Sequence, residues 1–169
     1  MITLDIPAGS WPGLTEKIRA AGYSIEQNND VFIGSPEAQA IIDAYTVADA
    51  LAAAKAEITA EIDRRAASIR DATTAGTSPA EMASWPIKRA EAEAYTADAN
   101  ASVPVLTMEA QARGVPVAAL VARVMANSAM LSALEAQIAG VSGRHRDSVN
   151  AASSVEAVFG YDFTTGWPG

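Results

Sequence analysis

The stretch that decides the fold is VADALAAAKAEITAEIDRRAASIRD, residues 47–71. Its large apolar residues recur at a period of about 3.6 residues, which places them on one face of an α-helix. They are Leu51, Ile58, Ile62 and Ile69, with Val47 and Ala54 at the edge of the stripe. Charged residues lie off the stripe, and Glu61 and Arg65 have the i,i+4 spacing of a favourable ion pair. This pattern predicts an amphipathic helix of roughly seven turns, ended by the Gly/Thr-rich residues 72–77.

Helix-start signals lie on both sides of this stretch. Ser35-Pro36-Glu37 combines an N-cap, a proline at the first helical position and an acid in the first turn. We expect that helix to reach about Tyr45 and either continue or break before Val47. Residues 78–81, Ser-Pro-Ala-Glu, form a capping box that begins another helix, which the proline at 86 should kink or restart.

The second half of the chain predicts a short and a long helix. Residues 100–104 form a break, residues 107–113 a short helix, and Gly114 its C-cap. Pro116 opens the long helix, whose apolar stripe is Val117, Leu120, Val124, Leu131, Leu134, Ile138 and Val141. Asn127 interrupts the stripe, either as a buried polar residue that fixes the register of an oligomer or as an edge residue facing water.

The N-terminal residues have a different pattern. Residues 2–6 alternate like a strand, residues 14–21 fit a short helix, and two β-like runs flank residues 27–30, an Asn/Asp-rich turn. We therefore expect a βαββ unit. The predicted class is α+β, predominantly α, with this small unit followed by a long helical hairpin or bundle. The expected parts are a small α/β head at 1–34, the helical part at 35–143, and a C-terminal helix end with an aromatic docking tail at 144–169.

Composition excludes several classes of function. The 169 residues carry a net charge of −8, so the electrostatic term for binding nucleic acid or an anionic membrane is repulsive. There is no cysteine, which excludes disulfides and thiolate sites. The N-terminus lacks the pattern of a signal peptide, and no apolar stretch approaches the ~20 residues of a membrane span. We expect a soluble protein made in the cytoplasm, with no nucleic-acid or membrane partner.

Residues suited to catalysis are sparse. The one histidine, His145, lies between two arginines, which disfavour a role as a base, and a surface position on a helix is the expected reading. Glu57 and Glu61, like Glu91 and Glu93, fit the solvent face of a helix. We expect no enzymatic activity, no metal and no cofactor. A hydrolase that uses paired acids such as Glu57 and Glu61 is the most distant alternative.

Aromatic residues supply the candidate interface. Only 6% of the chain is aromatic, and half is hydrophobic with much of that alanine, so the core is thin or completed by partner chains. Trp85 fits either core filling or an anchor. The candidate protein-interface residues are Trp11, Phe159, Tyr161, Phe163 and Trp167, because tryptophan and other aromatics are enriched at interface hot spots.

One region resembles a known group of proteins. Residues 50–95 read ALAAAKAEITAEIDRRAASIRDATTAGTSPAEMASWPIKRAEAEAY and end in the motif K-x-x-E-A-x-x-Y, Lys88 to Tyr95. Pro104 to Gly114 supplies P-x-L…A…G, and Leu120 to Val124 continues the pattern. About two-thirds of the chain thereby resembles the alanine-rich helical C-terminal region of small tail-fibre and baseplate-associated proteins of tailed bacteriophages. The N-terminal unit is outside the resemblance.

The resemblance implies a non-enzymatic part of the virion at the baseplate or tail-fibre junction, made in the host cytoplasm. Its partners would be other tail or fibre proteins, and we expect a homo-oligomer. Two alternatives stay open: a tail-fibre assembly chaperone that is absent from the mature virion, and a bacterial helical adaptor unrelated to phage.

Overall fold

The structure is a computed structural model that describes residues 1–5, 11–28 and 31–168. It is predominantly helical with a small antiparallel sheet at the N-terminus, so the predicted α+β class is confirmed. The chain forms two compact units: unit 1 is Met1–Arg65 with Ser142–Thr165, and unit 2 is Ala66–Val141 with Gly166–Gly169. The three-part division expected from the sequence stays a prediction.

The sheet of unit 1 has three strands, β1 (Ile2–Leu4), β2 (Ile25–Asn28) and β3 (Val31–Gly34), in the order β1-β3-β2. Both neighbouring pairs are antiparallel, with Leu4 opposite Phe32 and Ile25 opposite Gly34. Helix α1 (Leu14–Ala20) lies between β1 and β2 in the chain, which confirms the βαββ order. Of the turn predicted at residues 27–30, residues 27 and 28 belong to β2, and residues 29 and 30 lie outside the described residues, as do residues 6–10.

A small apolar core holds the sheet to two helices. Helix α2 (Pro36–Ala44) begins after Ser35 and ends before Tyr45, so the predicted start is confirmed and the chain breaks before Val47. Helices α1 and α2 contact each other, and they contact β2 and β1 respectively. The buried core residues are Leu4, Leu14, Ile18, Ile25, Ala38, Ile42, Tyr45 and Ala50.

The predicted long helix is α3 (Val47–Thr74). A capping box that sequence reading missed begins it: Thr46 N–H donates to the Asp49 carboxylate at 2.9 Å, and Asp49 N–H donates to the Thr46 hydroxyl at 3.2 Å. The buried face of α3 differs from the predicted stripe, because it contains more alanines and fewer of the large apolar residues. It consists of Ala50, Ala54, Ile58, Ile62 and Ala66, whereas Leu51 and Ile69 are half-buried and Val47 is exposed.

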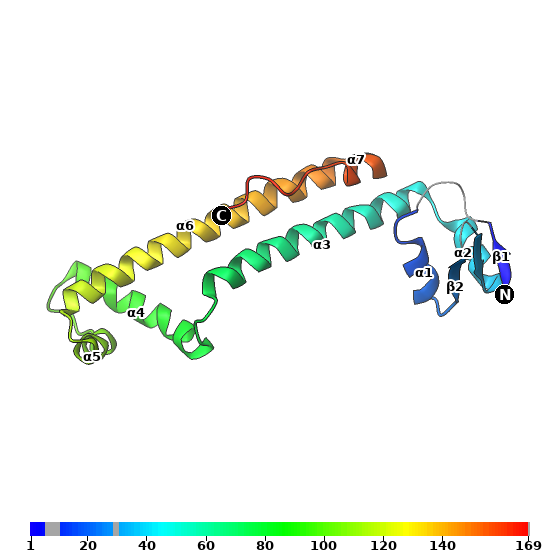
Figure 1. Ribbon diagram of the computed structural model, residues 1–169. Helices are drawn as coiled ribbons and strands as arrows, with labels where there is room; N and C mark the ends of the chain where they lie inside the picture. Colours follow the sequence, from blue (N-terminus) through cyan, green and yellow to red (C-terminus); the bar gives the residue numbers. More distant parts are fainter. Residues whose placement is uncertain (6–10, 29–30, 169) are drawn as a thin grey trace. The chain divides into compact units, whose positions relative to one another are not determined.

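Within each unit, the segments of α3 and α6 (Val117–Ala151) run antiparallel to each other (Figure 1). Polar contacts join the two helices in both units. In unit 1, Lys55 Nζ donates to the Asn150 carbonyl at 2.7 Å, and Arg146 Nε donates to Asp63 at 3.0 Å. In unit 2, Arg70 makes two hydrogen bonds to the Glu135 carboxylate. The hydrogen bond from Arg70 lowers the pKa of Glu135, and α6 continues past residue 143 without a break.

Unit 2 also contains α4 (Pro79–Ala97) and α5 (Pro104–Arg113). The Ser78 side chain accepts from Glu81 N–H at 3.1 Å, which confirms the predicted cap. Of the kink or restart predicted at Trp85-Pro86, the restart is wrong, because α4 continues through both residues, and the kink stays a prediction. A proline removes only one N–H from the helix. Helix α5 begins at Pro104 rather than at Thr107, and Gly114 ends it in the left-handed conformation, as predicted.

Candidate protein-interaction surfaces

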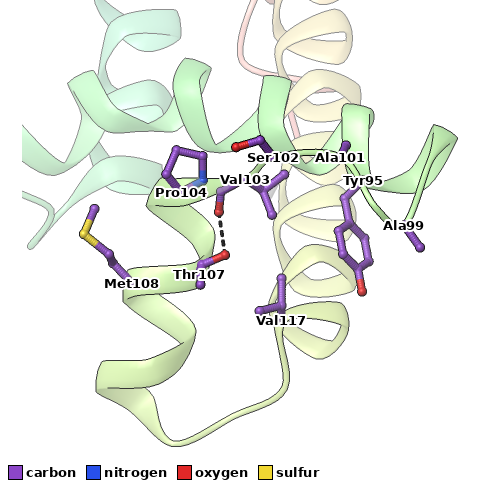
Figure 2. Close-up of a pocket in the computed structure, with 9 residues that line it drawn as sticks. All are labelled: Tyr95, Ala99, Ala101, Ser102, Val103, Pro104, Thr107, Met108 and Val117. Atoms are coloured by element: carbon purple, nitrogen blue, oxygen red, sulfur yellow. Dashed lines mark hydrogen bonds between the residues drawn. The ribbon is translucent and has the colours of Figure 1, made fainter.

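A groove in unit 2 lies where α4 ends, α5 begins and α6 begins (Figure 2). Its volume is about 520 Å³. The lining residues are Tyr95, Ala99, Ala101, Ser102, Val103, Pro104, Thr107, Met108 and Val117. Thr107 donates its hydroxyl to the Val103 carbonyl at 2.8 Å, so the hydroxyl is bound to backbone within the first turn of α5. The walls are mostly apolar, which suits contact with an apolar side chain of another polypeptide.

Two side chains of α4 hold α5 in place beside this groove. The Glu91 carboxylate accepts from the backbone N–H groups of Val105 and Leu106, at 3.1 and 2.9 Å. Lys88 Nζ lies 2.8 Å from the Glu109 carboxylate, and both side chains are less than one-fifth exposed. The hydrogen bond from Lys88 lowers the pKa of Glu109, with a smaller contribution from Arg113. The expectation that Glu91 faces solvent is therefore wrong: it caps a helix that lies 14 residues further along the chain.

The other acids named from the sequence are at least partly exposed, with Glu61 half-buried. Glu93 pairs with Arg89 at 2.8 Å. Glu61 pairs with Arg64 at the i,i+3 spacing, rather than with Arg65 as the sequence suggested. Glu57 is exposed on α3. Within residues 1–5, 11–28 and 31–168, no cluster of three or more His, Asp or Glu residues has the geometry to hold a metal ion.

Helix α6 presents an extensive apolar surface to solvent. Between residues 117 and 134, the buried residues are Leu120 and Val121, while Met130 is 63% exposed. Exposed alanines follow one another at alternating spacings of three and four residues: Ala119, Ala122, Ala126, Ala129 and Ala133. By length and composition alone this helix could cross a membrane, and 11% of its most apolar segment is buried. The expectation that no such segment exists is therefore wrong for α6. Asn127 is exposed in the single chain.

The candidate interface residues are distributed over both units. Trp11 and Phe159, which are 148 positions apart in sequence, line one hollow of unit 1 with a volume of about 540 Å³. We call it the Trp11 hollow; its other lining residues are Pro12, Gly13, Thr15, Glu16, Ala53 and Glu57. Trp11 also packs against Tyr45, with ring centroids 5.6 Å apart, and Phe159, in α7 (Val155–Phe159), is 44% exposed. Tyr161 and Phe163 are half-buried in unit 1, and Trp167 is half-buried in unit 2. The assignment of all five to an interface stays a prediction.

The expectation that His145 lies on the surface is wrong, because it is 2% exposed. Its Nδ1 lies 2.7 Å from the Tyr161 hydroxyl, and its Nε2 lies 3.0 Å from the Thr165 carbonyl. A carbonyl only accepts, so Nε2 carries the proton and Nδ1 accepts from Tyr161 when the ring is neutral. The histidine thus fastens the segment after α7 to α6. Its burial could not be read from helix α6 alone, since the covering residues follow 16 to 20 positions later.

No model of a protein family, no curated protein and no solved structure matches the chain. Its function is therefore inferred from the sequence pattern and from the surfaces described above.

Proposed function

We propose that this protein is a non-enzymatic structural component of a bacteriophage tail, located in the virion at the baseplate or tail-fibre junction. It acts through protein–protein contacts with other tail or fibre proteins and with further copies of itself. The observation that carries the contact role is the solvent-exposed apolar surface of α6. Burying apolar surface is the main favourable term in association, and a helix that exposes this much of it gains by being covered.

The residues of the resemblance support the assignment to the tail in a specific way. In the motif K-x-x-E-A-x-x-Y, Lys88 pairs with Glu109, Glu91 caps α5, Ala92 is fully buried and Tyr95 packs on the core of unit 2. Further along, Leu106, Ala110 and Leu120 are buried in the same core. Each motif position therefore has a structural role in unit 2, and the assignment to a phage tail rests on the resemblance of this motif.

Purified particles provide the test. Particles from the host that carries the gene would be banded on a density gradient, washed at high salt, and analysed by quantitative mass spectrometry. We expect the protein in a fixed copy number relative to the major tail proteins. If it is bound to fibre protein in the lysate yet missing from the particles, it is an assembly chaperone. If it is in neither fraction, it is an adaptor unrelated to phage and the proposal is wrong.

A further inference from the structure

The Trp11 hollow combines two aromatic side chains with two carboxylates. Trp11 lies just before α1, Glu16 is in the first turn of α1, Glu57 comes from α3, and Phe159 comes from α7. Both glutamates are exposed to solvent. A hollow lined by aromatic rings and exposed carboxylates is a chemical environment for a cation that carries its own apolar or planar surface.

The walls of the hollow are held by close contacts inside unit 1. Gly13 has a φ of +75°, and a Cβ added there would lie 2.6 Å from the Cβ of Ala53 on α3. The Tyr45 hydroxyl donates to the Pro12 carbonyl next to it. The start of α1 is thus fixed against α3 before any ligand arrives, which reduces the ordering cost of binding.

The two carboxylates of the hollow form no close ion pair with a cation of the described part of the chain. The hydroxyl of Thr15 donates to Glu16 at 3.0 Å, but neither Glu16 nor Glu57 is in an ion pair among the described residues. Lys17 is bound to Asp49 at 3.2 Å and lies 5.0 Å from the centre of the Tyr45 ring. The neighbourhood therefore already contains one cation held by a carboxylate and an aromatic face.

We propose that the Trp11 hollow binds an arginine side chain of a partner protein. The guanidinium group is planar, stacks on aromatic rings and donates to two carboxylates from a rigid fork, which a lysine ammonium does not. The net charge of −8 attracts a basic partner segment toward the hollow. The inference rests on the proposed function in so far as it names the chemistry of a contacting tail protein.

The test uses the full chain labelled with ¹⁵N and the peptide acetyl-Ala-Arg-Ala-amide. The chain has three tryptophans, so the indole N–H signal of Trp11 is assigned with the Trp11→Phe variant, and those of Trp85 and Trp167 serve as internal references. We expect a saturable shift of the Trp11 signal alone. Glu57→Gln and Glu16→Gln each weaken the fitted dissociation constant roughly two- to fivefold, the range of exposed ion pairs.

Matched probes and a matched variant distinguish recognition from general attraction. The same peptide with citrulline in place of arginine keeps the shape without the charge, and a leucine peptide tests an apolar occupant. Glu26→Gln removes one exposed carboxylate of β2, outside the hollow, and should leave the dissociation constant within roughly twofold of the parent. Equal binding of citrulline, tighter binding of leucine, or equal weakening by Glu26→Gln would overturn the proposal.

The two proposals fail separately. Absence from purified particles would refute the tail assignment and leave the arginine titration intact. If the Trp11 indole signal does not shift when the arginine peptide is added, the binding site is refuted, even if the protein is abundant in particles.

Discussion

The carboxylate of Glu91 in α4 accepts a 2.9 Å hydrogen bond from the backbone N–H of Leu106 in α5, and it also accepts one from Val105. Helix α5 has no cap of its own, because Val103 precedes it without a side-chain oxygen and Pro104 has no N–H. A residue of another helix thus supplies the capping function. The carboxylate lies at the N-terminus of α5, where the partial positive charge of the helix dipole stabilises its negative charge.

Glu91→Ala removes the cap and leaves two part-buried donors to find water. We expect a loss of about 1–3 kcal/mol in the free energy of unfolding, measured by urea denaturation with circular dichroism. Glu91→Gln retains one acceptor oxygen, so we expect a smaller loss of free energy of unfolding than for Glu91→Ala. Glu93→Ala, two positions away and exposed, is the control, with an expected loss of about 0.5 kcal/mol or less. Equal losses for Glu91→Ala and Glu93→Ala would contradict the capping role.

Tyr161→Phe removes the hydroxyl that lies 2.7 Å from His145 Nδ1. We expect a loss of about 0.5–1.5 kcal/mol in stability and faster hydrogen exchange in residues 155–165, because this hydrogen bond fastens the segment to α6. Tyr23→Phe, at a half-buried tyrosine packed on the core of unit 1, changes the same group. If both variants exchange alike in residues 155–165, the contact between His145 and Tyr161 does not hold the segment.

Gly13→Ala tests the close approach of α1 to α3. An alanine at position 13 is strained by the positive φ, and its methyl group also clashes with Ala53. Gly22, at φ +84°, has the same backbone strain but open space around it. Gly22→Ala should therefore cost about 1 kcal/mol, the penalty of the left-handed conformation alone. We expect Gly13→Ala to cost a further ~1–3 kcal/mol from overpacking, part of which Ala53→Gly restores. Thermal denaturation of Gly13→Ala, Gly22→Ala and the double variant Gly13→Ala/Ala53→Gly measures both costs, and equal costs at the two glycines would contradict the contact.

Glu109 links stability to acid pH. Its pKa is lowered below its ordinary value of 4.5 in the folded chain, chiefly by the hydrogen bond from Lys88. Its contribution is therefore complete above pH 4.5 and is lost as the pH falls through the folded pKa. The stability difference between the parent and Glu109→Gln should be largest near pH 6 and shrink toward pH 3, as followed by urea denaturation. In a Lys88→Met background, this stability difference should be smaller at every pH. A stability difference that grows on acidification would contradict the link between Glu109 ionisation and stability.

The exposed face of α6 predicts association. Light scattering of the 17.5 kDa chain should give an oligomer mass that Met130→Lys lowers, since a charge on this face must be desolvated when the face is covered. Helix content should not change. Ala40→Lys, at an exposed site of α2, adds the same charge and should leave the mass unaltered. A monomeric parent at high concentration would contradict self-association.

Helix order and the local start and stop signals could be predicted from the sequence. The pattern around Ile58 and Ile62, the Ser78 cap and the Gly114 stop depend on residues within one or two turns of each other. The βαββ order followed from equally local signals. These features are encoded by short-range sterics and hydrogen bonding, so they need no knowledge of the tertiary fold.

The surfaces depend on contacts between distant residues, and here sequence reading was limited. Glu91 looked like a solvated acid because its partners lie in the next helix. His145 looked exposed because the chain that covers it follows α7. Trp11 and Phe159 were singled out separately, but nothing in their local sequence indicated that they line the same hollow. The Thr46–Asp49 capping box was readable and was missed.

Buried alanines place an upper limit on side-chain size at the centre of both units. Five of them are at most 1% exposed: Ala38, Ala54, Ala66, Ala92 and Ala110. A larger side chain at these positions must displace its neighbours, and glycine would loosen the helix, so acceptable replacements are confined to residues of nearly the same volume. The chemically least distinctive residues of this chain are therefore among its least replaceable, and natural variation should be narrowest at these positions.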